Sequence, residues 1–226
     1  MPKDTFFNLP EDKRALICDI AVDEFAEYPF ARASINRIVA KSGIAKGSFY
    51  QYFEDKKDLF LYVMQLIAEE KINYMSPIMR NPDEHDFFTL IRELYLAGIQ
   101  FANEHPKYAA IGTKFLANKE APIYQEAKAL GLLLSYPIYE KLLENAIARG
   151  EVRADVDINM LSHVIASMNV VVVEYYSEFL SQTFDESMIE TADKFLDLLK
   201  NGIGEKKGAQ AAISALTPDE INRRAR

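Results

Sequence analysis

The sequence predicts an all-α protein in which a small N-terminal unit of three helices precedes a larger helical domain. Apolar residues recur every three or four positions along most of the chain, and no stretch alternates apolar with polar residues as a strand would. Glycine and proline also stand where helices of ordinary length would end, at Pro29, Gly150 and Gly202. With 49% hydrophobic residues among 226, the chain can bury a sizeable core.

The N-terminal elements follow in order. A first helix is expected over residues 11–27, because apolar residues recur there every four positions. Ser34 is a favourable N-cap for the second helix. Gly43 can take the positive φ of a tight turn, and a third helix is expected over residues 45–52. A fourth helix begins near Asp55, which can cap it.

The rest of the chain predicts five further helices and a tail. The helices are expected over residues 86–104, 106–117, 122–149, 157–182 and 185–201. Pro137 lies inside the third of these and predicts a kink there. Thr217 begins a capping box that predicts a short terminal helix. We therefore expect an N-terminal domain over residues 1–58, a larger domain over residues 59–203 and a tail over residues 204–226.

The distribution of charge says more than the net charge of −8. No acidic residue occurs between Tyr28 and Phe53, and this window holds several cations, with further lysines just after it. The acidic residues lie mainly in the remainder of the chain. A small cationic surface on an acidic body is typical of a protein that contacts a polyanion at one end only.

Several classes of protein are not expected. The single cysteine, Cys18, has no partner for an internal disulfide and lies among apolar residues, and the three histidines are scattered, so no metal site, cofactor site or catalytic group is expected. Apolar runs such as residues 170–173 are too short to span a bilayer, and no signal peptide is recognisable. The expectation is a cytoplasmic protein without a membrane partner.

The most informative stretch comprises the second and third helices with their turn. If Ile38, Val39, Phe49 and Phe53 face inward together, the outward positions of the third helix can be read off the sequence. They are Lys46, Gly47, Ser48, Tyr50, Gln51 and Tyr52. Lysine and tyrosine can reach phosphates, serine and glutamine can read base edges, and glycine permits a close approach. These residue types suit a groove of duplex DNA.

The segment GIAKGSFYQYF, followed by DKKDLF, resembles the signature of the tetracycline-repressor (TetR) family of transcriptional regulators. The similarity covers residues 13–60. The matching positions are Ser42, Gly43, Lys46, Gly47, Ser48, Phe49, Tyr50, Tyr52, Phe53, Lys56 and Leu59. The C-terminal part resembles the family only in length, helix order and the turn at residues 148–151.

The resemblance implies a helix-turn-helix that binds double-stranded DNA. It places Lys46, Gly47, Ser48, Tyr50 and Tyr52 at DNA-contacting positions of the recognition helix. It also implies that Ser34 and Lys56, each at the start of a helix, bind phosphates. Gln51 is a further candidate for reading a base. The alternative reading makes Tyr50 and Tyr52 core aromatics.

The C-terminal half predicts a homodimer. The helix over residues 157–182 is apolar on nearly all sides, so it must be covered on more than one face. The last long helix carries two apolar stripes, one containing Phe195 and the other containing Leu196. Two copies of this helix pair could form a four-helix interface. The alternative is that both helices are central core.

An effector pocket is expected between the helices over residues 86–104, 122–149 and 157–182, which are rich in aromatic residues. Ligand contacts are assigned to Tyr95, Phe101, Tyr136, Asn169 and Glu174. Such a pocket would be apolar with a few polar groups, as ligand sites usually are.

Three functions are compatible with these observations. The first is a repressor that a small hydrophobic effector releases from DNA, and the second is a constitutive DNA-binding regulator without an effector. The third is a helical enzyme with a vestigial helix-turn-helix, which no catalytic constellation supports. A preformed cavity would favour the first over the second.

Overall fold

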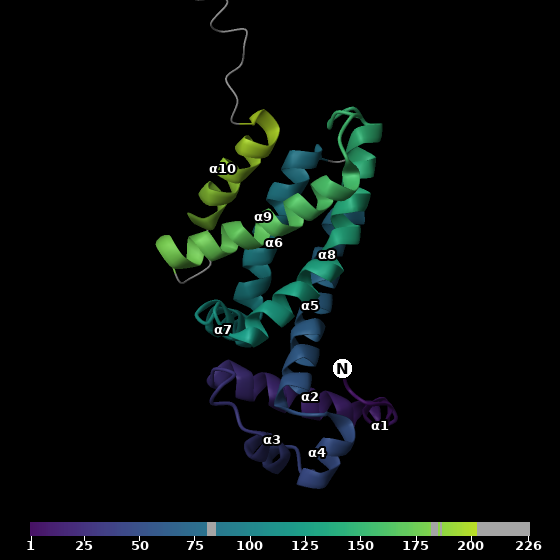
Figure 1. Cartoon of the computed structure of the whole chain (residues 1–226), viewed down its shortest axis with the longest axis vertical. Helices are drawn as coiled ribbons and strands as arrows, with labels where there is room; N and C mark the ends of the chain where they lie inside the picture. Colours follow the sequence, from purple (N-terminus) through teal and green to yellow (C-terminus); the bar gives the residue numbers. More distant parts are fainter. Residues whose placement is uncertain (81–84, 182–184, 186, 203–226) are drawn as a thin grey trace, which may run out of the picture.

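The computed structural model describes residues 1–80, 85–181, 185 and 187–202, and all regular structure in them is helical (Figure 1). The all-α prediction is confirmed. In chain order the helices are α1 (Asp4–Phe7), α2 (Glu11–Glu27), α3 (Ile35–Lys41), α4 (Lys46–Tyr52), α5 (Lys56–Arg80), α6 (Phe87–Glu104), α7 (Pro106–Leu116), α8 (Pro122–Ala148), α9 (Ile158–Phe179) and α10 (Ser187–Asn201).

The capping residue and the glycines named in the sequence lie at helix ends in the structure. The carboxylate of Asp55 accepts a hydrogen bond of 2.8 Å from the backbone N–H of Asp58 at the start of α5, as a capping residue should. Gly43, Gly150 and Gly202 have φ angles of 65°, 73° and 69°, so each supplies the left-handed conformation that a side chain would disfavour.

Some features differ from the prediction or were missed. The sequence did not predict α1. Helix α5 continues through Pro77 to Arg80, because a proline this close to the C-terminus removes little of the hydrogen-bond ladder. Helix α8 runs across Pro137, as expected for the helix predicted over residues 122–149. The proposed boundary between residues 58 and 59 falls in the first turn of α5. The tail and its predicted terminal helix lie outside the described residues.

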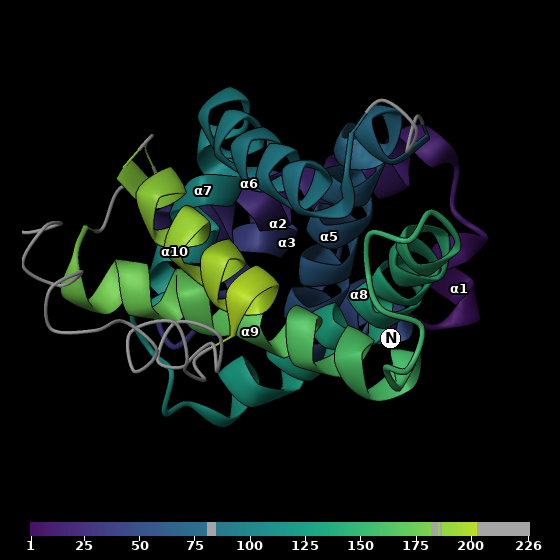
Figure 2. The ribbon, with the colours of Figure 1, turned by 90° about the horizontal axis from the view of Figure 1, so that it is seen from above.

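The helices form two hydrophobic cores, one at each end of α5 (Figure 1). The lower core joins α1 to α4 and the start of α5. The upper core joins α6, α8, α9 and α10, and α10 packs on both α6 and α9 (Figure 2). The three-helix unit of α2, α3 and α4 thus occupies one end of the long axis, with α5 leading from it into the larger domain.

The N-terminal unit is docked firmly on the larger domain. Ile111 of α7 and Ile123 of α8 are buried in the lower core, and α2 packs along α7. Two ion pairs cross the same junction, Lys107 with Asp23 and Lys57 with Glu126, the latter at 3.0 Å. The two parts therefore share a core, and α5 is not their only connection.

Helix α10 corrects one detail of the dimer prediction. Phe195 and Leu196, which represent its two apolar stripes, are 5% and 7% exposed and both belong to the upper core of the same chain. Both stripes are covered because α10 lies between α6 and α9. Phe195 is therefore not available to a partner subunit.

Helix α9 carries an uncovered apolar stripe. Its members are separated by four, seven, four and four residues, which places them on one face of the helix. They are Met160, Val164, Val171, Tyr175 and Phe179, which are between 42% and 66% exposed. By length and composition alone α9 is also long and apolar enough to cross a membrane, although its uninterrupted apolar runs are short. Core helices of soluble proteins satisfy the same criterion.

Candidate nucleic-acid interface

The turn between α3 and α4 fixes the orientation of α4. The hydroxyl of Ser42 donates to the carbonyl of Ile38 at 2.8 Å, and the backbone N–H of Ile44 donates to the carbonyl of Val39 at 3.2 Å. Phe49 is fully buried in the lower core. Because these contacts hold one side of α4 inward, its opposite side is presented to solvent.

The outward side of α4 carries most of the predicted DNA-contacting residues. Lys46, Gly47 and Gln51 are exposed, the ring of Tyr50 is 44% exposed, and Ser48 is half-buried. Within the described part of the chain, the side chains of Lys46, Ser48 and Gln51 have no hydrogen-bond partner. A Cβ atom at Gly47 would meet nothing within 4 Å. This face is thus free to meet a molecule from outside.

Tyr52 does not lie on that face. It is only 8% exposed, and its ring centroid lies 6.1 Å from that of Phe6 in α1. The alternative reading of Tyr52 as a core aromatic is therefore the better description of its position, whereas Tyr50 lies outward. Tyr52 is buried because α1 covers it, and the sequence did not predict α1.

The same N-terminal segment supports the C-terminal end of α4. The backbone N–H of Lys3 donates to the carbonyl of Tyr52 at 2.8 Å, and its ammonium donates to the carbonyl of Tyr50 at 2.9 Å. The hydroxyl of Thr5 donates to the carbonyl of Gln51. Carbonyls at a helix end lack partners within the helix, so these donors stabilise the last turn of α4.

Ser34 and Lys56 are each tied into the scaffold. Ser34 is the N-cap of α3, but its hydroxyl makes no capping hydrogen bond. The ammonium of Lys56 donates to the carbonyl of Ala33 at 2.9 Å and lies 4.7 Å from the ring centroid of Phe30. Burial lowers the pKa of Lys56 from its usual value. Lys56 therefore holds the segment between α2 and α3 in place, in addition to any role toward phosphate.

A buried carboxylate in α2 organises this segment, and the sequence analysis did not identify it. Glu24 is 0% exposed. It accepts hydrogen bonds from the backbone N–H of Ser34 at 2.7 Å and from Nε of Arg37 at 2.9 Å. The hydrogen bond to Glu24 raises the pKa of Arg37, so its charge is secure. A buried acid facing an arginine 13 positions later has no local signature, because only the tertiary fold brings them together.

Because Arg37 pairs with Glu24, fewer positive side chains on this surface are free to contact a phosphate. Arg37 is neutralised by Glu24, and Lys57 pairs with Glu126. Among the described residues, Arg32, Lys41 and Lys46 are exposed and form no ion pair. The cationic surface predicted from the acid-free window is therefore present, but it is carried by fewer residues than the sequence suggested.

None of the five predicted ligand residues lines either of the two cavities described below, and most of them make contacts within the protein. Phe101 packs against His105, with ring centroids 4.4 Å apart, and Tyr136 stacks on His163 at 3.8 Å. Asn169 donates to the hydroxyl of Tyr139 at 2.9 Å. These are ordinary packing and hydrogen-bonding contacts between helices.

Glu174 is also already occupied. It accepts hydrogen bonds from the ammonium of Lys128 at 2.8 Å and from the hydroxyl of Tyr124. Burial alone would raise the pKa of Glu174, but these two donors and the charge of Lys128 hold it below its usual value. The carboxylate is thus a neutralised link between α8 and α9.

Tyr95 is the exception among these residues. It is 9% exposed, and its hydroxyl has no hydrogen-bond partner in the part of the chain that the structure describes. Burial, and secondarily the neighbouring Tyr139, raise the pKa of Tyr95. A buried hydroxyl without a partner is unfavourable, so Tyr95 differs from the other predicted ligand residues in having an unsatisfied polar group.

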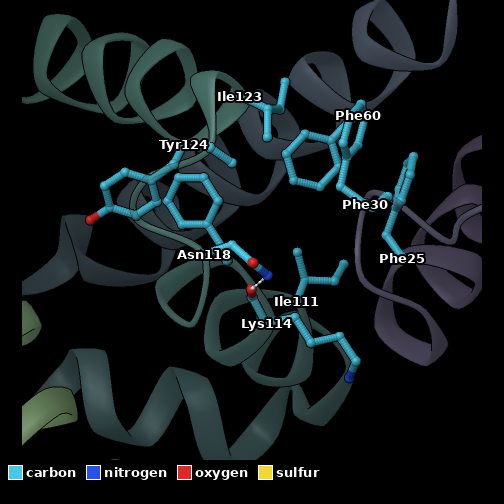
Figure 3. A pocket seen from close by; sticks show the side chains of 11 residues that line it. Phe25, Phe30, Phe60, Ile111, Lys114, Asn118, Ile123 and Tyr124 are labelled. Atoms are coloured by element: carbon cyan, nitrogen blue, oxygen red, sulfur yellow. Dashed lines mark hydrogen bonds between the residues drawn. The ribbon is translucent and has the colours of Figure 1, made fainter.

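Two cavities lie where the N-terminal unit meets the larger domain, and neither is lined by the five predicted ligand residues. One, of about 100 Å³, is enclosed by aromatic residues from α2, α5, α7 and α8 (Figure 3). The other, of about 310 Å³, is more open and is lined by Cys18 and several acidic residues. Burial raises the pKa of the Cys18 thiol to about 11, so it remains protonated near neutral pH and is a poor nucleophile.

Comparison with known proteins agrees with this geometry. The sequence profile described as "Bacterial regulatory proteins, tetR family" matches residues 17–63, which span α3, α4 and most of α2. A crystal structure of a TetR family transcriptional regulator from Chloroflexus aurantiacus J-10-FL is 31% identical. That alignment covers 89% of this chain and 98% of the other, with a TM-score of 0.51.

Two further relatives extend along most of the chain. The HTH-type transcriptional regulator YvdT of Bacillus subtilis (strain 168), whose function is uncharacterized, is 23% identical over 90% of this chain and 99% of its own. The transcriptional regulator FadR from Bacillus subtilis, solved in complex with stearoyl-CoA, is 18% identical. It covers 84% of this chain and 99% of its own, with a TM-score of 0.61.

Proposed function

The chain belongs to the TetR family of bacterial regulatory proteins, and we propose that it is a repressor that binds duplex DNA as a homodimer and leaves it when a small hydrophobic molecule binds. Members of this family are transcriptional regulators and not enzymes. The proposal concerns the direction of regulation, the residues that contact DNA, the dimer and the effector. It also includes a cytoplasmic location.

The outward face of α4 carries the proposal. Lys46, Gly47, Ser48, Tyr50 and Gln51 project from a helix whose other side is anchored by buried Phe49. In a helix-turn-helix the second helix enters the major groove and its side chains contact base edges. We assign Ser48 and Gln51 to base edges and Lys46 and Tyr50 to phosphates.

Ser34 and Lys56 complete the proposed contact surface. The hydroxyl of Ser34 is not used by the helix that it precedes, so it is free to donate to a phosphate. Lys56 retains a positive charge beside it, although part of its hydrogen-bonding capacity is spent on Ala33. We leave Tyr52 out of this set because its ring is covered by α1.

The exposed stripe of α9 supports the homodimer. A contiguous apolar face of this kind is uncommon on a monomer, and a partner copy would cover it. In a two-fold dimer the two copies of α9 would pack against each other and set the separation of the two α4 helices. We expect that separation to be about 34–36 Å on DNA, one turn of the duplex.

The effector is expected to be hydrophobic and to bind within the larger domain. FadR of Bacillus subtilis binds stearoyl-CoA within a similar fold, which supports a hydrophobic effector for this chain. We place it between α6, α8 and α9, where the buried hydroxyl of Tyr95 lacks a partner among the described residues. The alternative is a constitutive regulator with a filled core.

Selection from a pool of random duplexes, followed by gel-shift titration, tests DNA recognition. If the dimer makes about 6–10 phosphate contacts, affinity should fall by about 10³ to 10⁵ between 50 and 200 mM salt. Lys46→Gln should weaken binding, whereas Lys141→Gln should not, because Lys141 is an exposed lysine of α8 in the larger domain. Recovery of no preferred sequence would contradict a specific regulator.

The effector needs a separate measurement. Hydrophobic compounds that raise the melting temperature should be retested for release of the selected DNA, because a ligand of the folded state stabilises it by mass action. If compounds stabilise the protein without releasing DNA, or if none stabilises it, the constitutive regulator replaces the effector-controlled repressor.

A further inference from the structure

The smaller cavity, which we call the junction cavity, lies in the joint between the DNA-binding unit and the larger domain. Its walls come from both sides: Phe25 and Phe60 from α2 and α5, and Ile111, Phe115 and Tyr124 from α7 and α8. Figure 3 shows Tyr124 on one side of it and Phe25, Phe30 and Phe60 on the other. A molecule in this space would touch both parts of the protein at once.

The aromatic rings around the cavity form a connected series. The ring of Phe25 meets that of Phe60 edge to face at 4.9 Å, and Phe30 lies 5.1 Å from Phe60. On the far side the centroids of Phe115 and Tyr124 are 4.4 Å apart. Such walls offer both ring faces and ring edges, which is the environment that another aromatic ring prefers.

The size of the junction cavity limits the ligand to a single ring. Its volume is about 100 Å³, below the roughly 150 Å³ of an apolar cavity that holds benzene, so a single ring is the upper limit and the walls must give a little to admit it. The cavity is partly open, so a substituent on the ring can remain at the mouth. Phe30, which packs on Phe60, lies outside any helix, in the segment between α2 and α3.

The charge at the mouth of the cavity selects the substituent. Lys114 is the one charged residue in its lining and is half-buried, and the side-chain amide of Asn118 donates to its backbone carbonyl at 3.4 Å. Within the described residues Lys114 forms no ion pair, and no carboxylate lines the cavity. An anionic group at this position would gain a partner, whereas a cationic group would face an uncompensated like charge.

We propose that the junction cavity binds a small aromatic carboxylate, with its ring among Phe25, Phe60 and Phe115 and its carboxylate paired with the ammonium of Lys114. This site differs from the effector site proposed near Tyr95. Occupancy would fill a void in the joint and so stabilise the docked arrangement of the two parts. Tyr124 also hydrogen-bonds to Glu174, so the cavity wall is linked directly to α9.

Calorimetric titration of the full-length protein with benzoate, benzylamine and toluene tests the proposal. Benzoate is expected to bind saturably at one site per chain and to raise the melting temperature. Benzylamine and toluene are expected to bind about tenfold more weakly than benzoate. Toluene lacks the anionic group that would pair with Lys114, and benzylamine brings a second positive charge near it. Equal affinity for benzoate and benzylamine, or no saturable binding of benzoate, would overturn the proposal.

Two variants locate the site. Lys114→Gln should reduce the affinity for benzoate about tenfold while leaving toluene unaffected. Ala121→Leu places a larger side chain in the cavity wall and should abolish benzoate binding, whereas Ala148→Leu, at an exposed position of α8, should not. Benzoate binding that survives both Lys114→Gln and a folded Ala121→Leu would place the ligand elsewhere. DNA binding plays no part in these measurements, so their failure would leave the proposed repressor function intact.

Discussion

Val171→Glu is the sharpest test of the proposed dimer. Val171 is 46% exposed in the stripe on α9, so a partner subunit would cover about half of a valine side chain. Loss of that burial costs about 1 kcal/mol per copy, since complete burial of a valine contributes roughly 1.5–3 kcal/mol. Desolvating a carboxylate near the edge of an interface adds about 2 kcal/mol per copy, a discounted value for a group that keeps some water.

The two copies in a symmetric dimer double these costs. The sum, about 6 kcal/mol, corresponds to a dimer dissociation constant raised about 10⁴-fold. Leu16→Glu is the matched control, because Leu16 is also 46% exposed but lies on α2. Phe195→Glu provides a second contrast: Phe195 belongs to the upper core, so this change should lower the melting temperature at every protein concentration.

Sedimentation equilibrium across a range of protein concentrations measures the effect. We expect the wild type and Leu16→Glu to be dimers at micromolar concentration and Val171→Glu to be a folded monomer. A wild-type monomer, or equal dimerisation of Val171→Glu and Leu16→Glu, would refute the reasoning that the α9 stripe is the interface.

The remaining predictions concern DNA recognition and the larger domain. Ser48→Ala should change the base preference at one position of the DNA site by about 1–3 kcal/mol, whereas Lys56→Ala should weaken binding to all DNA sequences equally. Binding assays on single-base variants of the selected DNA site distinguish these two effects. Tyr95→Phe should stabilise the protein by about 1 kcal/mol, because it removes a buried hydroxyl without a partner. Tyr139→Phe should destabilise the protein, because it removes the acceptor of the hydrogen bond from Asn169. Thermal melts compare the two variants, and the reverse order would contradict the view that the Tyr95 hydroxyl is unsatisfied. The pKa of Glu174 is lowered in the folded protein, so the ionised carboxylate stabilises the fold at pH values above the ordinary carboxyl pKa. This stabilisation is lost as the pH falls through the pKa that Glu174 has in the folded protein. The difference in melting temperature between the wild type and Glu174→Gln should therefore vanish in acid. A constant difference would show that charge on Glu174 is not involved.

Local sequence signals predicted the helix-turn-helix because its determinants are close together in the chain. The turn at Gly43, the cap at Asp55 and the inward position of Phe49 each depend on neighbours within one or two helical turns. The position of Tyr52 could not be predicted in this way. It is buried by Phe6, 46 positions earlier, and only the folded chain brings them together.

The direction of the predicted ligand side chains also could not be derived from nearby residues in the sequence. Placing Phe101 and Tyr136 on helices was straightforward, but the direction in which each points depends on how the helices are rotated against their neighbours. Tyr136 of α8, for example, stacks on His163 of α9, a contact that depends on how these two helices are rotated against each other. Burial on several sides leaves no sequence periodicity that would distinguish a cavity wall from ordinary core.

The joint between the two domains constrains how an effector could release DNA. Withdrawing Ile111 and Ile123 from the lower core would cost roughly 1.5–3 kcal/mol for each side chain. The two together cost at least as much as the roughly 1–3 kcal/mol that an allosteric ligand typically supplies as coupling free energy. The exposed ion pair between Lys57 and Glu126 contributes only about 0–1 kcal/mol and can be exchanged within that range. An effector is therefore expected to move the DNA-binding unit together with α7 and the start of α8, and to change the separation of the two recognition helices without undocking either unit.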